Sequence, residues 1–223
     1  MTISELVAIC QANGLAISDA QAVLLERYQT LLRETNQVVN LISRKDEENI
    51  LEKHLLHSLT IAMPGVTGFE IPKAVSIFDI GTGGGLPGIP LKIVRPDLSV
   101  VVCDSIAKKI TAVSSMIASL NLLGITAIVS RAEDLPKIPK HRKAYDVIVS
   151  RAVAPLYELV KWTKDLLKPQ TTLLSLKGGD LSEEIGRTKQ IPFVKEVVES
   201  PLSLSGYDGF VTEEKKVVRV KLA

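Results

Sequence analysis

A short apolar run at positions 76–80 leads directly into a loop with four glycines among residues 81–85. Glycine has no Cβ, so the main chain of such a loop can approach a bound group closely. The amides at the start of a following helix can then face a polar ligand. A second apolar run, 98–103, ends in Asp104, about 20 residues after Gly83, where a strand–helix–strand nucleotide site carries its ribose-binding carboxylate. Together these features predict a nucleotide-like ligand at the carboxyl ends of two neighbouring strands.

Two classes of nucleotide cofactor share this layout. Gly83, Gly85 and Gly88 fit the dinucleotide fingerprint G-x-G-x-x-G. A proline on each side of the last glycine reshapes the loop and delays the helix, because proline is tolerated only in a helix's first turn. Asp79 at the strand end would repel a pyrophosphate but suits the ammonium group of S-adenosylmethionine. The residues therefore favour S-adenosylmethionine over NAD and leave both open, whereas a turn without a ligand would explain neither Asp79 nor Asp104.

Residues 78–91, Phe-Asp-Ile-Gly-Thr-Gly-Gly-Gly-Leu-Pro-Gly-Ile-Pro-Leu, resemble the signature of the RsmG (GidB) family of bacterial 16S rRNA guanine-N7 methyltransferases. Further blocks agree in the same order, from about residue 20 to the C-terminus. They are Asn40-Leu41, 54–59, Arg95-Pro96, Asp104-Ser105, Lys108-Lys109, 130–133, 150–152 and 176–178. The chain departs from the family at His57, where Asp is usual, and at Lys53 and Lys109, where Arg is common.

The resemblance implies an α/β fold of the class I S-adenosylmethionine-dependent methyltransferases. This fold is Rossmann-like, with a seven-stranded, mostly parallel sheet, here preceded by an N-terminal helical cap. The implied activity is methylation of guanine N7 in 16S rRNA of the small ribosomal subunit, with S-adenosyl-L-methionine as cofactor. The implied partner is 16S ribosomal RNA or an assembling small subunit.

The resemblance also implies where the cofactor is bound. Its contacts fall on Gly81, Leu86, Ala132, Glu133 and Arg151, and the residue pattern adds Gly83 and Asp104. Arg151 follows the fourth predicted strand and is the candidate catalytic residue, because it could hold the cofactor and donate to guanine O6. Three alternatives stay open: Leu86 as a core residue, Glu133 as a helix cap, and Arg151 as a loop brace paired with Asp79 or Glu133.

The segment after the fourth predicted strand, 149–155, lacks the motifs of other methyl-transfer reactions. It has no Asp/Asn-Pro-Pro-aromatic motif for exocyclic amines and no Pro-Cys nucleophile for pyrimidine carbons. Guanine N7 needs neither, since its lone pair is free, and positioning with electrostatics can suffice. His54 and His57 lie three residues apart, but without further suitably placed ligands we expect packed histidines and no metal.

Other functions remain compatible with the residues alone. They are a methyltransferase for a small molecule or protein, an NAD(P)-dependent oxidoreductase, and a catalytically silent RNA-binding module.

Helical periodicity dominates to about residue 63, and short apolar strands then alternate with helices. We therefore expect a helical cap over 1–68 and a methyltransferase core over 69–223, together one compact domain. Ser18 to Gln21 form a capping box that begins a long helix, and Asp46 is expected to cap another helix. The apolar stripe of the first helix is expected to consist of Val23, Leu24, Tyr28, Leu31 and Leu32.

The later part of the chain predicts the sheet. Strands are expected near 75–80, 99–103, 125–129, 145–149, 171–176, 193–199 and 216–222, and helices near 88–95, 105–122, 156–167 and 182–190. Turn residues at 205–209 separate the last two strands, which should form a hairpin that adds an antiparallel strand.

The net charge of +2 is too small to indicate RNA binding by itself. Basic residues cluster at 137–143 and 215–221, but only the family resemblance assigns them to RNA. Cys10 and Cys103 have no C-x-x-C spacing and read as reduced core thiols of a cytoplasmic protein. No apolar run approaches the roughly 20 residues of a membrane span, so we expect no membrane partner. We also expect a monomer.

Overall fold

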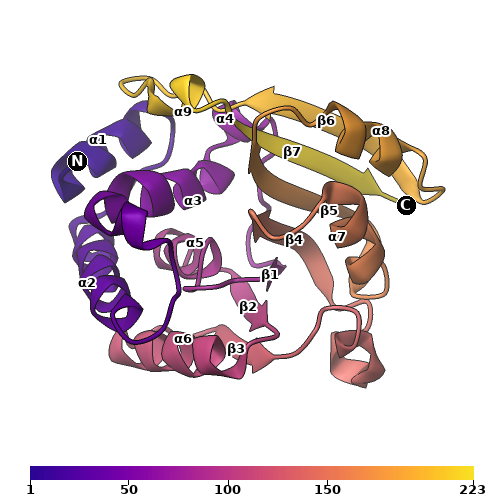
Figure 1. Cartoon of the computed structure of the whole chain (residues 1–223), viewed down its shortest axis with the longest axis horizontal. Coiled ribbons are helices and arrows are strands. Elements are labelled where there is room, and N and C mark those ends of the chain that lie inside the picture. Colours follow the sequence, from indigo (N-terminus) through magenta and orange to yellow (C-terminus); the bar gives the residue numbers. More distant parts are fainter.

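A seven-stranded sheet lies at the centre of the computed structural model, which describes residues 1–223 (Figure 1). Its strand order is β3-β2-β1-β4-β5-β7-β6. The strands are β1 (Ser76–Ile80), β2 (Ser99–Asp104), β3 (Ile125–Val129), β4 (Tyr145–Arg151), β5 (Leu167–Gly178), β6 (Val194–Pro201) and β7 (Lys215–Leu222). Strands β1 to β5 are parallel, and β7 runs antiparallel to both β5 and β6. The predicted sheet and the antiparallel pairing of its last two strands are confirmed.

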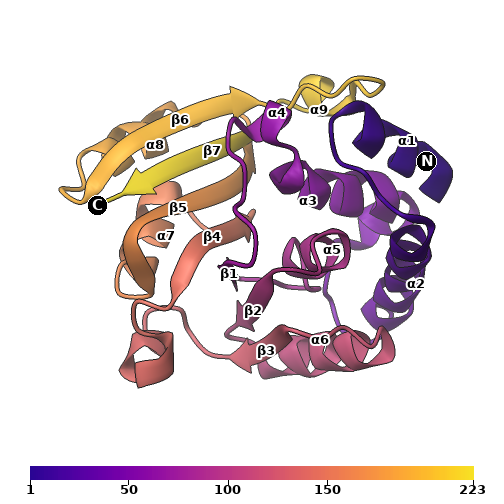
Figure 2. The same cartoon turned by 180° about the vertical axis from the view of Figure 1, so that it is seen from behind.

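Helices cover both faces of this sheet (Figures 1 and 2). They are α1 (Ile3–Ala12), α2 (Asp19–Asn36), α3 (His57–Leu59), α4 (Pro64–Thr67), α5 (Gly88–Val94), α6 (Ala107–Ser119), α7 (Leu156–Thr163), α8 (Ser182–Lys189) and α9 (Gly209–Thr212). Ile77 belongs to the apolar core on the side of α1, α2, α5 and α6. Phe78, next in the strand, belongs to the core on the side of α7. The inner strands β1, β2 and β4 are buried on both faces and are apolar almost throughout, as parallel strands usually are, whereas β6 at the edge of the sheet has no buried residue.

The expected capping box begins α2. Ser18 Oγ accepts from the Gln21 amide at 3.3 Å, and Gln21 Oε1 accepts from the Ser18 amide at 2.9 Å. Gln21 Nε2 also donates to the carbonyls of Ile93 and Val94 at 3.0 Å, which fastens α2 to the end of α5. Val23, expected in the apolar stripe, is 63% exposed. The side chains of α2 share one apolar core with the sheet, and the domain boundary at residue 68 stays a prediction.

The second predicted helix is built differently from the expectation. Ser43, not Asp46, caps it, with its Oγ accepting from the Lys45 amide at 3.3 Å. The chain forms a 3₁₀ helix, η1 (Arg44–Asn49), then a π-helix, η2 (Ile50–Leu56), then α3 and the 3₁₀ turn η3 (Thr60–Ala62). The prediction for Asp46 was wrong because this residue lies inside η1, and its carboxylate is paired with Lys53 at 3.4 Å.

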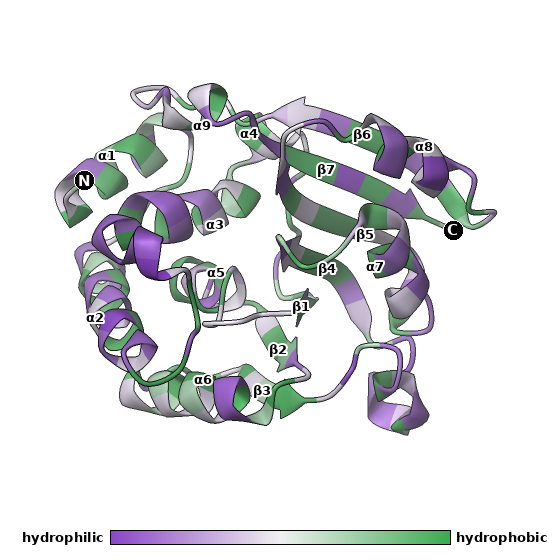
Figure 3. Ribbon diagram, in the orientation of Figure 1, coloured by the Kyte–Doolittle hydropathy of each residue, from purple (hydrophilic) through white to green (hydrophobic).

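Hydrophobic residues line the central strands, while hydrophilic residues mark the outer faces of the helices (Figure 3). Two 3₁₀ turns, η4 (Leu135–Lys137) and η5 (Pro139–His141), connect β3 to β4. Cys10 and Cys103 are buried free thiols, as predicted. None of the helices combines the length and the apolar character that a bilayer crossing requires.

Candidate functional site

The backbone of the glycine loop after β1 adopts conformations that are strained or sterically blocked for residues with a side chain. Gly81 has φ +66° and Gly83 φ +57°, both in the left-handed region. A Cβ on Gly81 would lie 2.6 Å from both γ carbons of Val153. A Cβ on Gly88 would lie 2.5 Å from Cγ1 of Val102, so this glycine lets α5 pack closely against β2. The glycines therefore allow two close contacts, one between the loop and Val153 and one between α5 and β2.

Asp79 holds the glycine loop through two hydrogen bonds. Its Oδ2 accepts from Thr82 Oγ1 at 2.5 Å and from the Gly88 amide at 2.8 Å. Its Oδ1 is buried and has no hydrogen-bond partner. Burial raises the pKa of Asp79 to about 7, although the two hydrogen bonds and the charge of Arg151 oppose that shift. The carboxylate lines neither of the two pockets at the strand ends, so here it braces the loop and does not face the ligand space.

The raised pKa of Asp79 predicts a pH-dependent stability. The folded chain holds a proton on Asp79 between about pH 4 and pH 7, where an unfolded Asp has lost it. The free energy of unfolding should therefore fall as pH rises through this window, by up to about 1.4 kcal/mol per pH unit from this group, and level off above it. Urea unfolding of the wild type and of Asp79→Asn, which keeps the shape but cannot ionise, measures this contribution. A wild-type minus variant difference that is the same at pH 5 and pH 7.5 would contradict it.

The first pocket lies at the carboxyl ends of β1 to β4. Gly81, Asp104, Ala132 and Glu133 line it, as does Trp162 from α7. Asp104 Oδ2 accepts from the Gly83 amide at 3.1 Å and Oδ1 from the Ile106 amide at 2.9 Å. Each carboxylate oxygen has a second lone pair, so Asp104 can fix the loop and still accept from a ligand.

The second pocket adjoins the first and shares Gly81, Lys109 and Ala152 with it. Gly83, Leu86 and Arg151 line it. Its outer wall comes from segment 41–57 and from the loop before β7. That wall carries the charged or titratable side chains Asp46, Lys53, His54, His57, Glu213 and Lys215. All of the cofactor residues expected from the sequence thus line one of two adjoining pockets.

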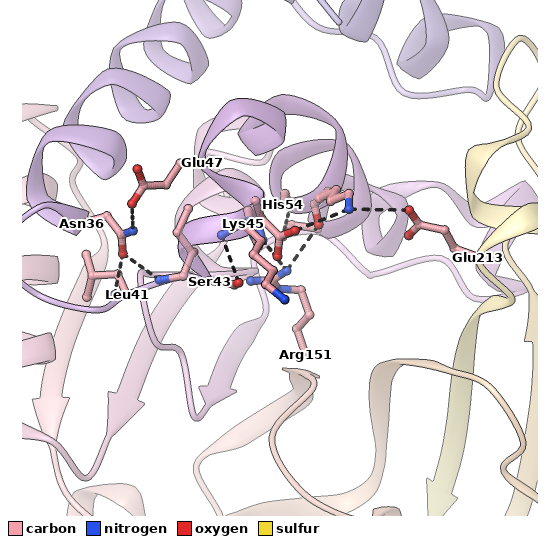
Figure 4. Close-up of polar contacts among 12 residues, drawn as sticks. Asn36, Leu41, Ser43, Lys45, Glu47, His54, Arg151 and Glu213 are labelled. Carbon is pink, nitrogen blue, oxygen red and sulfur yellow. Dashed lines mark hydrogen bonds and ion pairs between the residues drawn. The ribbon is translucent and has the colours of Figure 1, made fainter.

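Arg151 extends from the end of β4 toward His54 on η2 (Figure 4). Its Nη1 donates to His54 Nδ1 at 2.7 Å and to the Lys53 carbonyl at 3.4 Å. Its Nε is buried and has no hydrogen-bond partner. Arg151 forms no ion pair, so the alternative in which it is paired with Asp79 or Glu133 is wrong. Glu133 lies 3.8 Å from Arg131, and Asp79 accepts hydrogen bonds from Thr82 and Gly88.

The N-terminal helices supply contacts that the sequence did not reveal. Tyr28 on α2 donates through its hydroxyl to the Gly84 carbonyl at 2.8 Å, inside the core. Asn36 Oδ1 accepts from the amides of Leu41 and Ile42 at 2.8 and 3.0 Å (Figure 4). These two side chains hold the glycine loop and the wall of the second pocket. The only indication of these contacts in the sequence was that Tyr28 and Asn36 carry polar groups on the otherwise apolar side of α2.

In the two basic clusters, several of the basic side chains are already paired with carboxylates or buried. Lys137 pairs with Asp134 at 2.6 Å, and His141 is buried with Nδ1 2.6 Å from the Tyr145 hydroxyl. Lys140, Arg142 and Lys143 remain exposed or half-buried. In the C-terminal cluster, ion pairs join Lys215 to Glu213, Lys216 to Glu199 and Arg219 to Glu196. Residues 140–143 are therefore the better candidates for binding an external anion.

Comparison with known proteins gives consistent matches. The family model described as rRNA small subunit methyltransferase G matches residues 21–207. "Ribosomal RNA small subunit methyltransferase G" of Chlorobaculum tepidum is 40% identical over 202 residues, covering 88% of this chain and 89% of the relative. The protein of the same name from Chlorobium phaeobacteroides is 37% identical over 220 residues, covering 96% and 94%.

Solved structures agree on the fold. A SAM-dependent methyltransferase from Aquifex aeolicus superposes with a TM-score of 0.56 at 17% identity, covering 81% of this chain and 96% of that one. A putative methyltransferase in complex with the Haloferax volcanii Trm112 activator gives a TM-score of 0.60 at 11% identity, covering 86% and 97%. At such low identity these likenesses describe the architecture alone.

Proposed function

The chain belongs to the family of rRNA small subunit methyltransferase G, and on that premise we propose that it methylates N7 of a guanine in 16S rRNA. It is an S-adenosyl-L-methionine-dependent rRNA methyltransferase; the target atom and the roles of the residues are our proposal. The observation that carries the proposal is the pair of adjoining pockets that meet at Gly81. One pocket is suited to the cofactor's nucleoside, and the other brings Arg151 to the place where a base would enter.

The residues of the first pocket fit the adenosine part of S-adenosylmethionine. Gly81 lines this pocket without a side chain, so a ligand can meet its main chain, while Val153 occupies the direction in which a Cβ would point. Asp104 would accept from the ribose hydroxyls, and Ala132 and Glu133 would meet the adenine, with Trp162 as a further wall. Gly83 and Leu86 would border the methionine part in the second pocket. When bound, S-adenosylmethionine supplies an electrophilic methyl group on its sulfonium sulfur.

Arg151 would hold the base in line with that methyl group. Its buried, unpaired Nε is a donor that a guanine carbonyl oxygen could satisfy. N7 carries no proton, so the site needs no general base. The two histidines suit this requirement, since burial lowers the pKa of His54 to about 3 and that of His57 well below its usual value. Orientation of the base in line with the methyl group then provides the catalysis.

The alternatives left open by the residues give way to the family assignment. An NAD(P)-dependent oxidoreductase, a methyltransferase for a small molecule or protein, and a silent RNA-binding module are each incompatible with membership of an rRNA methyltransferase family. We further propose that the protein acts in the cytoplasm as a monomer, which light scattering of the purified protein tests.

The direct test of the proposal is nucleoside analysis. Purified protein is incubated with S-adenosylmethionine and small subunits, or their 16S rRNA, from cells that lack it. The RNA is then digested and its nucleosides are separated by mass spectrometry. We expect one new 7-methylguanosine per RNA. A new methylated nucleoside of any other kind would refute the N7 assignment.

Lys140, Arg142 and Lys143 are expected to bind RNA phosphates. Replacing all three with alanine should flatten the dependence of log affinity on log salt by about 0.7–0.9 for each phosphate that the variant no longer neutralises. Lys216→Ala is the matched control, because this lysine is already paired with Glu199 at 2.6 Å. Filter binding to 16S rRNA across a salt series measures the slope. An unaltered slope in the triple variant would make these residues ordinary solvated surface.

A further inference from the structure

We infer that His54 is a positioning residue, which acts as a neutral hydrogen-bond acceptor and orients the guanidinium of Arg151 without cancelling its charge. The inference rests on the proposed function, in which Arg151 works at the meeting point of the two pockets. It assigns a role to a side chain that itself need touch neither substrate nor cofactor.

The partner of His54 determines its tautomer. Arginine carries only hydrogen-bond donors. The contact of 2.7 Å between Arg151 Nη1 and His54 Nδ1 therefore requires a lone pair on Nδ1. The ring hydrogen must then be on Nε2, which is buried without a hydrogen-bond partner and lies 3.8 Å from Asp46 Oδ2. Only the neutral ring with its proton on Nε2 fits this geometry.

The surroundings keep the ring neutral. His54 is 6% exposed, and burial is the largest cause of its lowered pKa, followed by the charge of Arg151. Lys53 on η2 and Lys215 on β7 add to the shift, and the nearby His57 is itself neutral. Asp46 is the opposing charge, and Glu213, on the same wall, is already engaged by Lys53 and Lys215. A second ring proton, on Nδ1, would point at the N–H group of the guanidinium, so protonation would break this hydrogen bond and separate the two side chains.

This arrangement has a functional consequence. Arginines are commonly fixed by a carboxylate, which forms a strong bidentate pair but neutralises much of the charge. No carboxylate lies within ion-pair distance of Arg151; its anchors are an imidazole nitrogen and the Lys53 carbonyl. The guanidinium is thus held in one orientation while its charge and its Nε remain available to a ligand.

The test compares two substitutions of His54. Asparagine can place an acceptor oxygen near the position of Nδ1, whereas leucine fills the space and cannot accept. We expect His54→Leu to lower kcat by about 10- to 100-fold, as a misplaced catalytic group does, and His54→Asn to stay within a few-fold of the wild type. Affinity for S-adenosylhomocysteine, followed by the fluorescence of Trp162 in the first pocket, should change less than kcat in both variants. Equal losses in the two variants would overturn the inference.

A double-mutant cycle separates positioning from simple packing. If His54 acts through Arg151, adding His54→Leu to Arg151→Ala should lower kcat little further. Multiplied losses would mean that His54 acts independently and would overturn the inference. Should His54→Leu fail to fold, His54→Gln replaces it, because its acceptor reaches the Nε2 position and not Nδ1. Asparagine should then exceed glutamine in kcat by about 10-fold, and equal rates would overturn the inference.

The experiments distinguish a failure of the proposed function from a failure of the role inferred for His54. If the methylated atom is not guanine N7, nucleoside analysis reports that directly. The coupling between His54 and Arg151 can still be measured on whatever methyl transfer the protein performs.

Discussion

Replacing Gly81 with valine is expected to weaken S-adenosylmethionine binding by at least about 100-fold, equivalent to about 2.7 kcal/mol. The new Cβ would lie 2.6 Å from both γ carbons of Val153, and the position has φ +66°, which a β-branched residue adopts only with strain. Gly81 and Val153 both line the first pocket, so relieving this clash would push Val153 and the glycine loop into the space proposed for the cofactor. Calorimetry with S-adenosylhomocysteine measures the loss, and circular dichroism checks the fold.

Two controls separate the steric effect from backbone strain. Gly206 also has a positive φ, +82°, but a Cβ there would meet no atom within 4 Å, so Gly206→Ala should leave cofactor binding unchanged. Gly81→Ala should bind better when combined with Val153→Ala, because the second substitution removes the atoms that clash. Wild-type affinity in Gly81→Val would remove the glycine loop from the cofactor site.

The strands of the sheet could be predicted because each is an apolar run that ends at a turn signal. β5 shows the limit of this reasoning. It begins at Leu167, four residues before its expected start at 171, and passes through Pro169, which reads locally as a break. Only pairing with Tyr145 of β4, across a register shift, makes Leu167 part of the sheet. Pairing between strands that are distant in the sequence leaves no pattern in the neighbouring residues from which it could be predicted.

The candidate site was predictable where it follows the strand ends and hidden where distant segments meet. Gly81 and Ala132 lie just beyond the strands that predicted them, and Asp104 is the last residue of its strand. The hydrogen bonds of Tyr28 with Gly84 and of Arg151 with His54 join residues 56 and 97 positions apart, which no spacing rule connects. Trp162 likewise reaches the first pocket only because α7 packs back beside it.

Asp79 is the instructive case, since its orientation could have been read from the strand itself. Side chains alternate between the faces of a strand, so Asp79 shares the face of Ile77, which belongs to the core on the α5 side. That places its carboxylate beneath the loop, where the Gly88 amide meets it at 2.8 Å. A carboxylate at this position suits an ammonium partner by its chemistry, but the period of two places it beneath the loop and away from both pockets.

Replacing the target guanosine with 7-deazaguanosine is expected to abolish methyl transfer while leaving RNA affinity within a few-fold of the natural substrate. The analogue has carbon in place of N7 and so has no lone pair to attack the methyl group, yet it keeps the pairing edge and the backbone. An RNA with 7-deazaguanosine at a neighbouring guanosine is the matched control and should be methylated normally. Incorporation of label from S-adenosylmethionine measures the rates. Methylation of the deaza target would exclude N7 and the reaction proposed for this site.

The same chemistry predicts how the rate depends on pH. N7 carries no proton, and a reaction without a general base should lose little rate between about pH 8 and pH 5.5. The histidines cannot impose a transition in this range, because burial and the charge of Arg151 hold the pKa of His54 at about 3 and that of His57 well below its ordinary value. Asp79 releases its proton near pH 7, but folding is favoured on the acidic side of that step. A rate that instead collapses near pH 6.5 in the wild type, and not in His54→Asn, would make His54 a general base.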